Sequence, residues 1–247
     1  MSLENWTERT ELLIGSNGVE YLKNSHILIA GLGGVGGFTA EILARAGVGN
    51  MTLIDADTFH STNLNRQIGA LNSTIGQHKT DVFLNRLKDI NPNINLNLFT
   101  EFIVDERINE ILEGKFDYIA DAIDSLAPKT YLILNSVNRG FKLISSMGAG
   151  GKMQPEQIRI ADFSKSYNDG LARMLRKRLH KLGIYSGFPV VFSPEKTNPE
   201  SLIHIDNERN KKTTAGTISY MPMIFGAYMA SYIIRDLLNN CKLSFED

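Results

Sequence analysis

The chain has 247 residues, of which 43% are hydrophobic and 21% charged, with 26 basic and 27 acidic side chains. This length can bury a hydrophobic core, so we expect a single domain over residues 1–247 that folds without a disulfide or structural metal. The formal net charge of -1 excludes a protein that coats nucleic acid with an overall basic surface, although it allows a local basic patch. The single cysteine, Cys241, excludes an intrachain disulfide and a zinc site built from cysteine pairs.

The sequence also bears on location. Residues 1–10 include acidic and basic side chains and no apolar run, so we expect no signal peptide. The most hydrophobic segment, 218–234, is interrupted by Pro222 and Gly226 and falls short of the ~20 apolar residues of a membrane span. We interpret it as a buried helix, and peripheral contact with a membrane is the alternative. With the low cysteine content, these features predict a cytoplasmic protein.

Strands alternate with helices along the first 150 residues. Short apolar runs rich in β-branched residues predict buried strands, and helical spacing of apolar residues predicts the helices between them. The predicted elements are strand 26–30, helix 39–46, strand 51–54, helix 79–90, strands 95–99 and 118–122, helix 127–138 and strand 143–146. This order indicates right-handed βαβ units, and so an α/β fold with a doubly wound, mostly parallel sheet.

After Gly151 the pattern changes, which predicts C-terminal elaborations on this sheet. We expect a strand at 157–162, a basic helix at 171–182, a strand at 190–193, a mobile polar loop at 195–214 and a C-terminal helix.

A glycine-rich segment follows the first predicted strand and opens a helix. Gly31, Gly33 and Gly36 match the spacing GxGxxG, and Gly34 is a fourth glycine within it. Glycines there permit a tight turn and let backbone N–H groups approach a phosphate, although such turns also occur for structural reasons. Asp55 ends the second strand, where an acid can bind ribose hydroxyls, and Asp57 lies two residues further on. These features predict a nucleotide site and leave an NAD-dependent dehydrogenase open.

Three charged residues further along favour a nucleoside triphosphate. Arg66 can bind phosphate through two hydrogen bonds and Lys79 adds a positive charge, whereas a dehydrogenase needs neither. Asp124 follows a strand at the edge of the sheet where ligands bind, and its carboxylate can hold Mg²⁺. Each residue also has a structural interpretation: surface charges for Arg66 and Lys79, and a helix N-cap for Asp124.

The segments GLGGVG, LIDADT, NLNRQ, GQHK and DAIDS resemble, in order and spacing, the ThiF-type adenylating domain of ubiquitin-activating enzymes and their bacterial relatives. The resemblance covers about residues 25–151. It implies a Rossmann-like adenylating fold that binds ATP, with Mg²⁺ near Asp124 and a substrate carboxylate that attacks the α-phosphate. The catalytic residues that it implies are Asn63, Arg66, Lys79 and Asp124, and the ATP-binding set adds Gly31, Gly33, Gly34, Gly36, Asp55, Asp57, Gln67 and Ser125.

The resemblance also implies a homodimer, because members of this family complete each site with an arginine from the partner's N-terminal segment. Our candidate for that residue is Arg9, in the segment RTELL.

One branch of the family matches nearly the whole chain. The segments RTELLIG, SLAPK, GAGGK, DGLAR, VVFSPE and GTISYMP are similar to the tRNA threonylcarbamoyladenosine dehydratases. This implies ATP-dependent cyclisation of N6-threonylcarbamoyladenosine beside the tRNA anticodon, in which the threonyl carboxylate is adenylated. The substrate's own carbamoyl group then attacks the activated carbon, so no enzyme thiol is needed. We therefore interpret Cys241 as an apolar filler or a surface thiol.

The basic helix is our candidate tRNA surface. Residues 171–182 hold five basic residues and no acid, and helical spacing puts leucines on one face and basic side chains on the other. The candidate tRNA-binding residues are Arg173, Arg176, Lys177, Arg178 and Lys181. A solvated basic face is the alternative. We assign residues 25–151 to nucleotide binding, and residues 152–247 to substrate binding, tRNA binding and dimerisation.

Three other functions stay open on the sequence alone. The main alternative is an adenylyltransferase that activates the C-terminus of a ubiquitin-like sulfur-carrier protein, although most of these enzymes have CxxC pairs that this chain lacks. An NAD-binding oxidoreductase would need neither Arg66 nor Lys79. A non-catalytic nucleotide-binding module would keep the glycines without Asp124. A sulfur-transfer partner also stays open, because no residue clearly corresponds to the C-terminal cysteine of some relatives.

Overall fold

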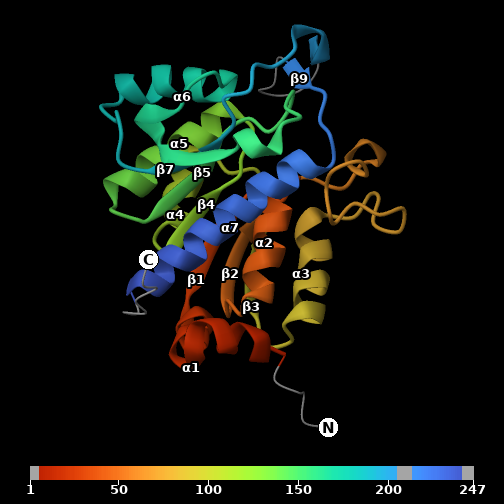
Figure 1. Ribbon diagram of the computed structural model, residues 1–247, viewed down its shortest axis with the longest axis vertical. Helices are drawn as coiled ribbons and strands as arrows, with labels where there is room; N and C mark the ends of the chain where they lie inside the picture. Colours follow the sequence, from red (N-terminus) through yellow and green to blue (C-terminus); the bar gives the residue numbers. More distant parts are fainter. Residues whose placement is uncertain (1–5, 205–212, 241–247) are drawn as a thin grey trace.

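A seven-stranded sheet forms the centre of the computed structural model, which describes residues 6–204 and 213–240 (Figure 1). The strand order is β3-β2-β1-β4-β5-β7-β6, and every neighbouring pair is parallel except the antiparallel pair β6 and β7. The strands are β1 (His26–Ala30), β2 (Asn50–Ile54), β3 (Asn95–Phe99), β4 (Tyr118–Asp121), β5 (Leu143–Ser146), β6 (Arg159–Asp162) and β7 (Pro189–Phe192). The predicted α/β fold with a mostly parallel sheet is confirmed.

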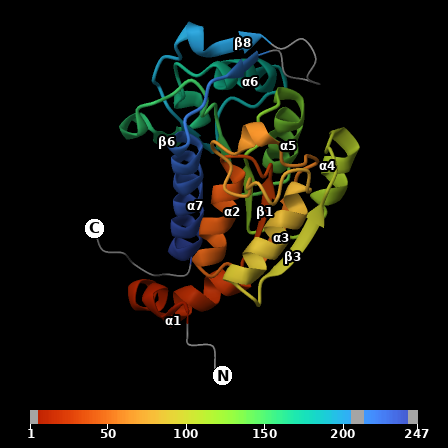
Figure 2. The same cartoon turned by 90° about the vertical axis from the view of Figure 1, so that its right-hand side faces the viewer.

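Helices cover both faces of the sheet (Figure 2). On one face lie α1 (Glu8–Asn24), α2 (Gly36–Arg45), α3 (Lys79–Ile90) and α7 (Tyr220–Asn240); on the other lie α4 (Asp105–Ile111), α5 (Leu126–Asn138) and α6 (Gly170–Lys181). Successive residues of a strand point to opposite faces. In β1, Ile27 and Ile29 therefore join one core cluster while Leu28 and Ala30 join the other. Burial on both sides explains why the four residues after His26 are all apolar.

The strand order reverses at β1, which lies between β2 and β4. The segments that leave the carboxyl ends of these strands begin at Gly31, Asp55 and Ala122, and they meet at one edge of the sheet. In open α/β sheets such a switch point is where ligands bind. The fold therefore brings together three segments that sequence analysis singled out separately.

The structure contains two helices that the sequence did not predict. Helix α1 includes Gly15 with φ of 72°, which kinks the helix, and Gly18, so no regular apolar spacing runs along it. Helix α4 has only seven residues. Four short 3₁₀ helices complete the assignment: η1 (Ser61–Asn63), η2 (Pro155–Gln157), η3 (Phe163–Lys165) and η4 (Pro199–Ser201).

The interpretation of residues 195–214 as a loop throughout was wrong. Leu202–His204 (β8) and Thr213–Ala215 (β9) pair as a two-stranded antiparallel sheet, because backbone hydrogen bonding across the stretch compensates for the lack of an apolar pattern. Residues 205–212 of the predicted loop lie outside the described residues, so its mobility stays a prediction.

The hydrophobic segment near the C-terminus forms helix α7. Its side chains at Phe225, Met229 and Ile233 are fully buried in the core, as a buried helix requires. Within the described residues, no helix is both long and apolar enough to cross a membrane.

Candidate active site

Backbone packing requires two of the glycines in the turn after β1. Gly31 has φ of 91°, which glycine adopts readily, and a Cβ there would lie 2.8 Å from the carbonyl oxygen of Ala122. A Cβ on Gly36 would overlap the carbonyl oxygen of Gly31 at 1.8 Å. Gly33 differs, because its nearest neighbour beyond the turn would be the Gln67 side chain, at 3.8 Å. The turn is therefore packed on one side and open above Gly33.

Asp55 follows β2 and hydrogen-bonds to the backbone of this turn. Its carboxylate is 8% exposed and accepts hydrogen bonds from the backbone N–H of Leu32 at 2.6 Å and of Asp57 at 2.8 Å. Lys79, the first residue of α3, is also buried, with its Nζ 2.8 Å from Asp57 Oδ2 and 3.5 Å from Asp55 Oδ1. Burial raises the pKa of Asp55, and the charge of Lys79 opposes that rise. Three predicted residues thus form one cluster beside the glycine-rich turn.

Arg66 and Asp124 come from different segments and interact electrostatically. The Arg66 guanidinium is half-buried and donates from Nη1 to the Thr62 carbonyl at 2.9 Å and to Asn65 Oδ1 at 2.8 Å. Burial lowers the pKa of Arg66, and the nearby Asp124 carboxylate opposes that effect. Asp124 is exposed to solvent. The interpretation of Asp124 as a helix N-cap is wrong, because Ser125 occupies the N-cap position of α5.

Two amide side chains complete this side of the site. Asn63 is buried, and its Oδ1 accepts a hydrogen bond from the backbone N–H of His60 at 3.0 Å. Gln67 is also buried beside Gly33, and its Oε1 is one of two buried side-chain atoms in the described chain without a hydrogen-bond partner. A buried acceptor without a donor is unfavourable by about 1–3 kcal/mol. A ligand that donates a hydrogen bond to Gln67 Oε1 would remove this penalty.

Arg9 is not brought to the site within one chain. It is exposed on α1, two residues after Thr7, whose side chain packs beside Gly47 just before β2 begins. The start of α1 therefore lies at the amino edge of the sheet, opposite the glycine-rich turn. Figure 1 also places α1 and α6 at opposite ends of the molecule.

The structure separates the five basic residues of α6 into two groups. Arg173, Lys177, Arg178 and Lys181 are exposed, as a nucleic-acid surface requires. Arg176 is half-buried, and its Nη2 donates to the carbonyl oxygen of Ser166.

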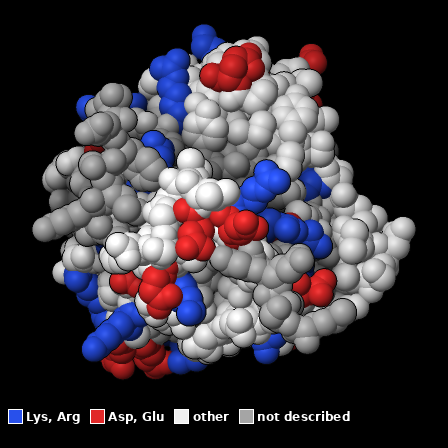
Figure 3. Space-filling view, turned by 60° about the horizontal axis from the view of Figure 1, so that its bottom comes forward, with Lys and Arg blue, Asp and Glu red and all other residues white. Residues whose placement is uncertain are grey.

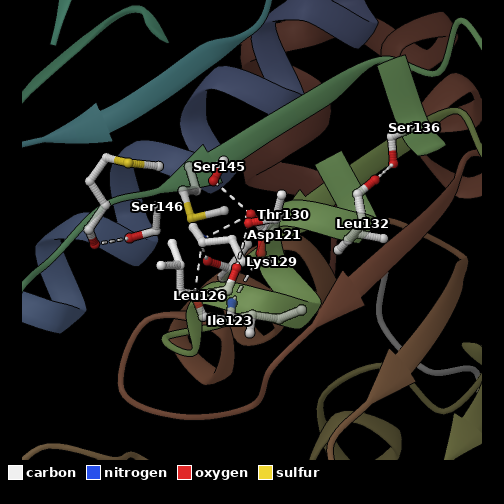
Figure 4. Close-up of polar contacts among 12 residues, drawn as sticks. Asp121, Ile123, Leu126, Lys129, Thr130, Leu132, Ser136, Ser145 and Ser146 are labelled. Carbon is white, nitrogen blue, oxygen red and sulfur yellow. Dashed lines mark hydrogen bonds and ion pairs between the residues drawn. The ribbon is translucent and has the colours of Figure 1, made fainter. Parts of the chain in front are cut away.

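Sequence analysis missed a buried ion pair below the site. Lys129 Nζ lies 2.8 Å from Asp121 Oδ2, and both side chains are completely buried (Figure 4). Lys129 also donates to the Ile123 carbonyl at 2.9 Å, and Ser145 Oγ donates to Asp121 Oδ2 at 2.6 Å. The sequence feature that could have indicated this pair is a charged residue among apolar ones. Asp121 ends a buried strand, and Lys129 interrupts an apolar helix face.

A second missed cluster joins the segments after β5 and β7. The buried Lys152 donates from Nζ to the carbonyl oxygens of Ser193, at 3.0 Å, and Glu195. The buried Asp169 caps α6 and accepts from the Gly148 backbone N–H at 3.2 Å. Burial lowers the pKa of Lys152 and raises that of Asp169. Three segments that resemble the dehydratases, 148–152, 169–173 and 190–195, therefore meet in the folded chain.

The described residues contain no group of three or more His, Cys, Asp or Glu side chains that could hold a metal ion. Magnesium in nucleotide enzymes is usually bound by one or two carboxylates together with the phosphates. The exposed carboxylate of Asp124, at the ligand edge of the sheet, fits that requirement without a larger protein cluster.

A doubly wound sheet with a glycine-rich turn and acidic side chains at its switch point defines a nucleotide-binding α/β protein. The ThiF family model matches residues 8–246, and the chain belongs to this family. The chain is 38% identical over 242 residues to the tRNA threonylcarbamoyladenosine dehydratase of Bacillus subtilis, a match that covers 95% of each protein. The resemblance inferred from the motifs is confirmed.

The solved structures agree with this assignment. The crystal structure of the Escherichia coli tRNA N6-threonylcarbamoyladenosine dehydratase, TcdA, in complex with ATP, matches with a TM-score of 0.87 at 31% identity. That match covers 97% of this chain and 98% of the other. The Escherichia coli molybdopterin-synthase adenylyltransferase is 37% identical over 154 residues, but the match covers only 62% of this chain and 59% of that protein.

Proposed function

We infer that this protein is an ATP-dependent tRNA threonylcarbamoyladenosine dehydratase, which closes the threonylcarbamoyl side chain of the modified adenosine into a ring. One observation carries this function: the similarity to dehydratases extends over nearly the full length of both chains. The similarity to a carrier-protein adenylyltransferase is confined to part of each chain. The dehydratase function is therefore favoured over the main alternative.

In the first step an oxygen of the threonyl carboxylate attacks the α-phosphorus of ATP and pyrophosphate leaves. Negative charge shifts on the phosphates during this step, and positive groups placed nearby stabilise it. We assign that task to Arg66, Lys79 and the backbone N–H groups of the turn above Gly33. The half-buried position of Arg66 supports this role, because fewer waters screen its charge there.

In the second step the carbamoyl group of the same side chain attacks the activated acyl carbon. A new bond closes the five-membered ring, the carbamoyl group loses a proton, and AMP leaves with the acyl oxygen. Over both steps the substrate loses the elements of water and ATP becomes AMP and pyrophosphate. A nucleophile on the same molecule has a very high effective concentration, so the reaction needs no protein thioester.

We further propose that Asp124 binds Mg²⁺ together with the phosphates of ATP. The ion would neutralise part of the phosphate charge. The carboxylate lies at the sheet edge and interacts with Arg66, so one acidic and one basic group of this chain would flank the triphosphate.

The exposed basic residues of α6 are our candidate contacts to tRNA phosphates. They are Arg173, Lys177, Arg178 and Lys181, and no acidic residue interrupts them within the helix. The face at the other end of the molecule differs, because basic and acidic side chains are mixed there (Figure 3). This contrast supports α6 as the surface that binds nucleic acid.

We also propose that the protein is a homodimer in which Arg9 reaches the ATP site of the partner. Leu12 and Leu13, on the same helix, are 81% and 77% exposed, which supports a protein interface there. The separation of Arg9 from the site of its own chain supports a contribution in trans. A tRNA substrate and ATP also favour the cytoplasm as the place of the reaction.

The test is nucleoside mass spectrometry of threonylcarbamoyl-modified tRNA after incubation with the protein and ATP, under mild conditions that preserve the ring. We expect conversion to a nucleoside lighter by one water, together with release of AMP and pyrophosphate. Reactions without ATP, and with tRNA that lacks the modification, are the controls. Unchanged nucleosides together with an acyl-adenylate on a small carrier protein would instead support the alternative function.

A further inference from the structure

One buried ion pair holds both backbone polar groups of Ile123. Asp121 Oδ1 accepts from the Ile123 N–H at 3.1 Å, and Lys129 Nζ donates to the Ile123 carbonyl at 2.9 Å. Lys129 Nζ and Asp121 Oδ2 are themselves 2.8 Å apart (Figure 4). We call Asp121 and Lys129 the Ile123 clamp.

The clamp lies between two parts of the candidate active site. On one side, the carbonyl of Ala122 packs where Gly31 lacks a side chain, so the segment rests on the glycine-rich turn. On the other side, Asp124 follows directly and interacts with Arg66. The peptide unit between Ile123 and Asp124 is planar, so a bond to the Ile123 carbonyl also fixes the direction of the Asp124 N–H. The clamp therefore sets the backbone from which the Asp124 carboxylate extends.

Stability alone does not explain this charged pair. Both side chains are completely buried, so neither charge is hydrated by solvent. Desolvation of two buried charges offsets most of their attraction, and apolar residues of similar volume are often as stable or more stable at such positions. A pair that also bonds both polar groups of one loop residue is better explained by the position that it gives to the loop.

We propose that Lys129, with Asp121, is a positioning residue for adenylation: it orients the Asp124 carboxylate at the ATP site through the Ile123 carbonyl. Neither clamp side chain touches the reacting atoms, because both are fully buried below the loop. This inference rests on the proposed function. It predicts a loss of turnover from a substitution in the core that leaves every ATP-contacting residue in place.

The main test uses the double variant Asp121→Asn with Lys129→Met. It removes both charges together and keeps similar shapes, so no lone charge is left in the core. We expect a folded protein whose turnover number for the cyclic nucleoside falls about 10²-fold, the scale for groups misplaced by ~1 Å. The KM for tRNA should change little, since the clamp lies under the ATP edge. The matched control is Ser136→Ala, which removes another buried polar group of α5 that bonds only to Leu132 of the same helix.

A double-mutant cycle with Asp124→Ala separates positioning from general structural damage, with single-turnover rates measured at excess enzyme. If the clamp acts through Asp124, its substitution should change the rate less than about twofold once Asp124 is alanine. Additive losses in the two backgrounds, or wild-type turnover in the clamp variant, would overturn the proposal. If the clamp variant does not fold, Ser145→Ala takes its place in the same cycle, because it removes one hydrogen bond to Asp121 and leaves both charges. Absence of product from the wild-type protein would instead contradict the proposed function itself.

Discussion

Arg176 Nη2 donates to the carbonyl oxygen of Ser166 at 2.6 Å, which ties the middle of α6 to the segment just before it. The same nitrogen lies 2.6 Å from Ser166 Oγ, and the guanidinium lies over the Phe163 ring at 5.6 Å. Arg176 therefore faces the protein, while Arg173 and Lys177 on the same helix face solvent.

This geometry predicts a loss of stability from Arg176→Gln. The variant loses charge-assisted hydrogen bonds and the contact with Phe163, so the free energy of unfolding should fall by about 1–3 kcal/mol. For a protein of this size the melting temperature should fall by about 2–4 °C per kcal/mol. Thermal unfolding measures the effect, and Arg173→Gln is the matched control that should leave the melting temperature unchanged. Equal melting temperatures for both variants would contradict the inward role of Arg176.

The exposed residues of α6 predict a salt-dependent effect on tRNA binding. Replacing Arg173, Lys177 and Lys181 together by Gln should weaken tRNA binding and leave ATP binding unchanged. Phosphate contacts release counterions, so the slope of log K against log salt should shrink by about 0.7–0.9 per lost contact. The measurement is tRNA affinity across a salt series, with ATP affinity as the control. Parallel slopes for the variant and the wild type would mean that the helix is only a solvated face.

The candidate active site predicts that Arg66→Ala and Asp124→Ala each reduce turnover by about 10²–10³, the usual contribution of one electrostatic group. Both side chains are at least partly solvent-accessible, so the variants should stay folded. Rates of cyclic nucleoside formation and melting temperatures measure the two effects. Lys88→Ala, an exposed change on α3, serves as the control. Turnover close to wild type in both variants would remove these residues from the site.

The proposed mechanism predicts that Cys241→Ser is fully active and that thiol alkylation does not inhibit the enzyme. The residue lies outside the described part of the chain, and the prediction rests on the internal nucleophile of the substrate. Turnover before and after alkylation measures it. An acyl-enzyme thioester trapped on Cys241 would contradict the mechanism and favour carrier-protein chemistry.

The pKa of Glu41 predicts a pH-dependent contribution to stability. Burial alone would raise this pKa, but hydrogen bonds from Arg86 at 2.5 Å and Arg45 at 3.0 Å outweigh it and lower the pKa. A lowered carboxyl pKa stabilises the fold above the ordinary value of about 4.3, and this contribution is lost as pH falls through the folded-state pKa. Glu41→Gln should therefore cost about 1–2 kcal/mol at pH 7.

Unfolding experiments at several pH values measure this contribution. The difference between wild type and Glu41→Gln should shrink as pH falls toward 3. A difference that stays constant with pH would mean that packing, and not charge, is what the substitution removes.

The strands of the central sheet were predicted well, because each buried strand is itself a short run of apolar residues. The strand 26–30 was predicted with its observed bounds, since four of its five residues are buried and a glycine, Gly31, follows its last residue. Helix α1 was missed because Gly15 and Gly18 interrupt any apolar spacing, and its burial depends on contacts with α7 that lie far away in sequence. Local patterns cannot report such contacts.

In the candidate active site, too, local patterns predicted some residues, while contacts between distant residues could not be predicted. Residues that follow strands, such as Asp55 and Asp124, could be placed at one edge because parallel strands end together. The clamp could not be predicted, because nothing in the spacing of Asp121, Lys129 and Ser145 says that they share hydrogen bonds inside the core. The contacts of Arg176 with the protein were missed for a related reason. Helical periodicity predicts the helix face on which a residue lies, but not the residues that its side chain contacts.

Gly226, in helix α7, packs closely against the start of α2. This packing affects the shape of the glycine-rich turn as well as the position of α7. A Cβ at Gly226 would lie 2.6 Å from the carbonyl oxygen of Val35, and a Cβ at Gly34 would lie 2.9 Å from the side chain of Pro222. Helix α7 therefore packs directly against the turn that we expect to bind the phosphates. A fragment that stops at Gly151 would keep every candidate ATP-binding residue of its own chain and still lack the surface against which that turn is shaped. Packing therefore couples helix α7 to the glycine-rich turn, so an insertion near residue 226 would disturb a turn that lies almost 200 residues earlier in the chain.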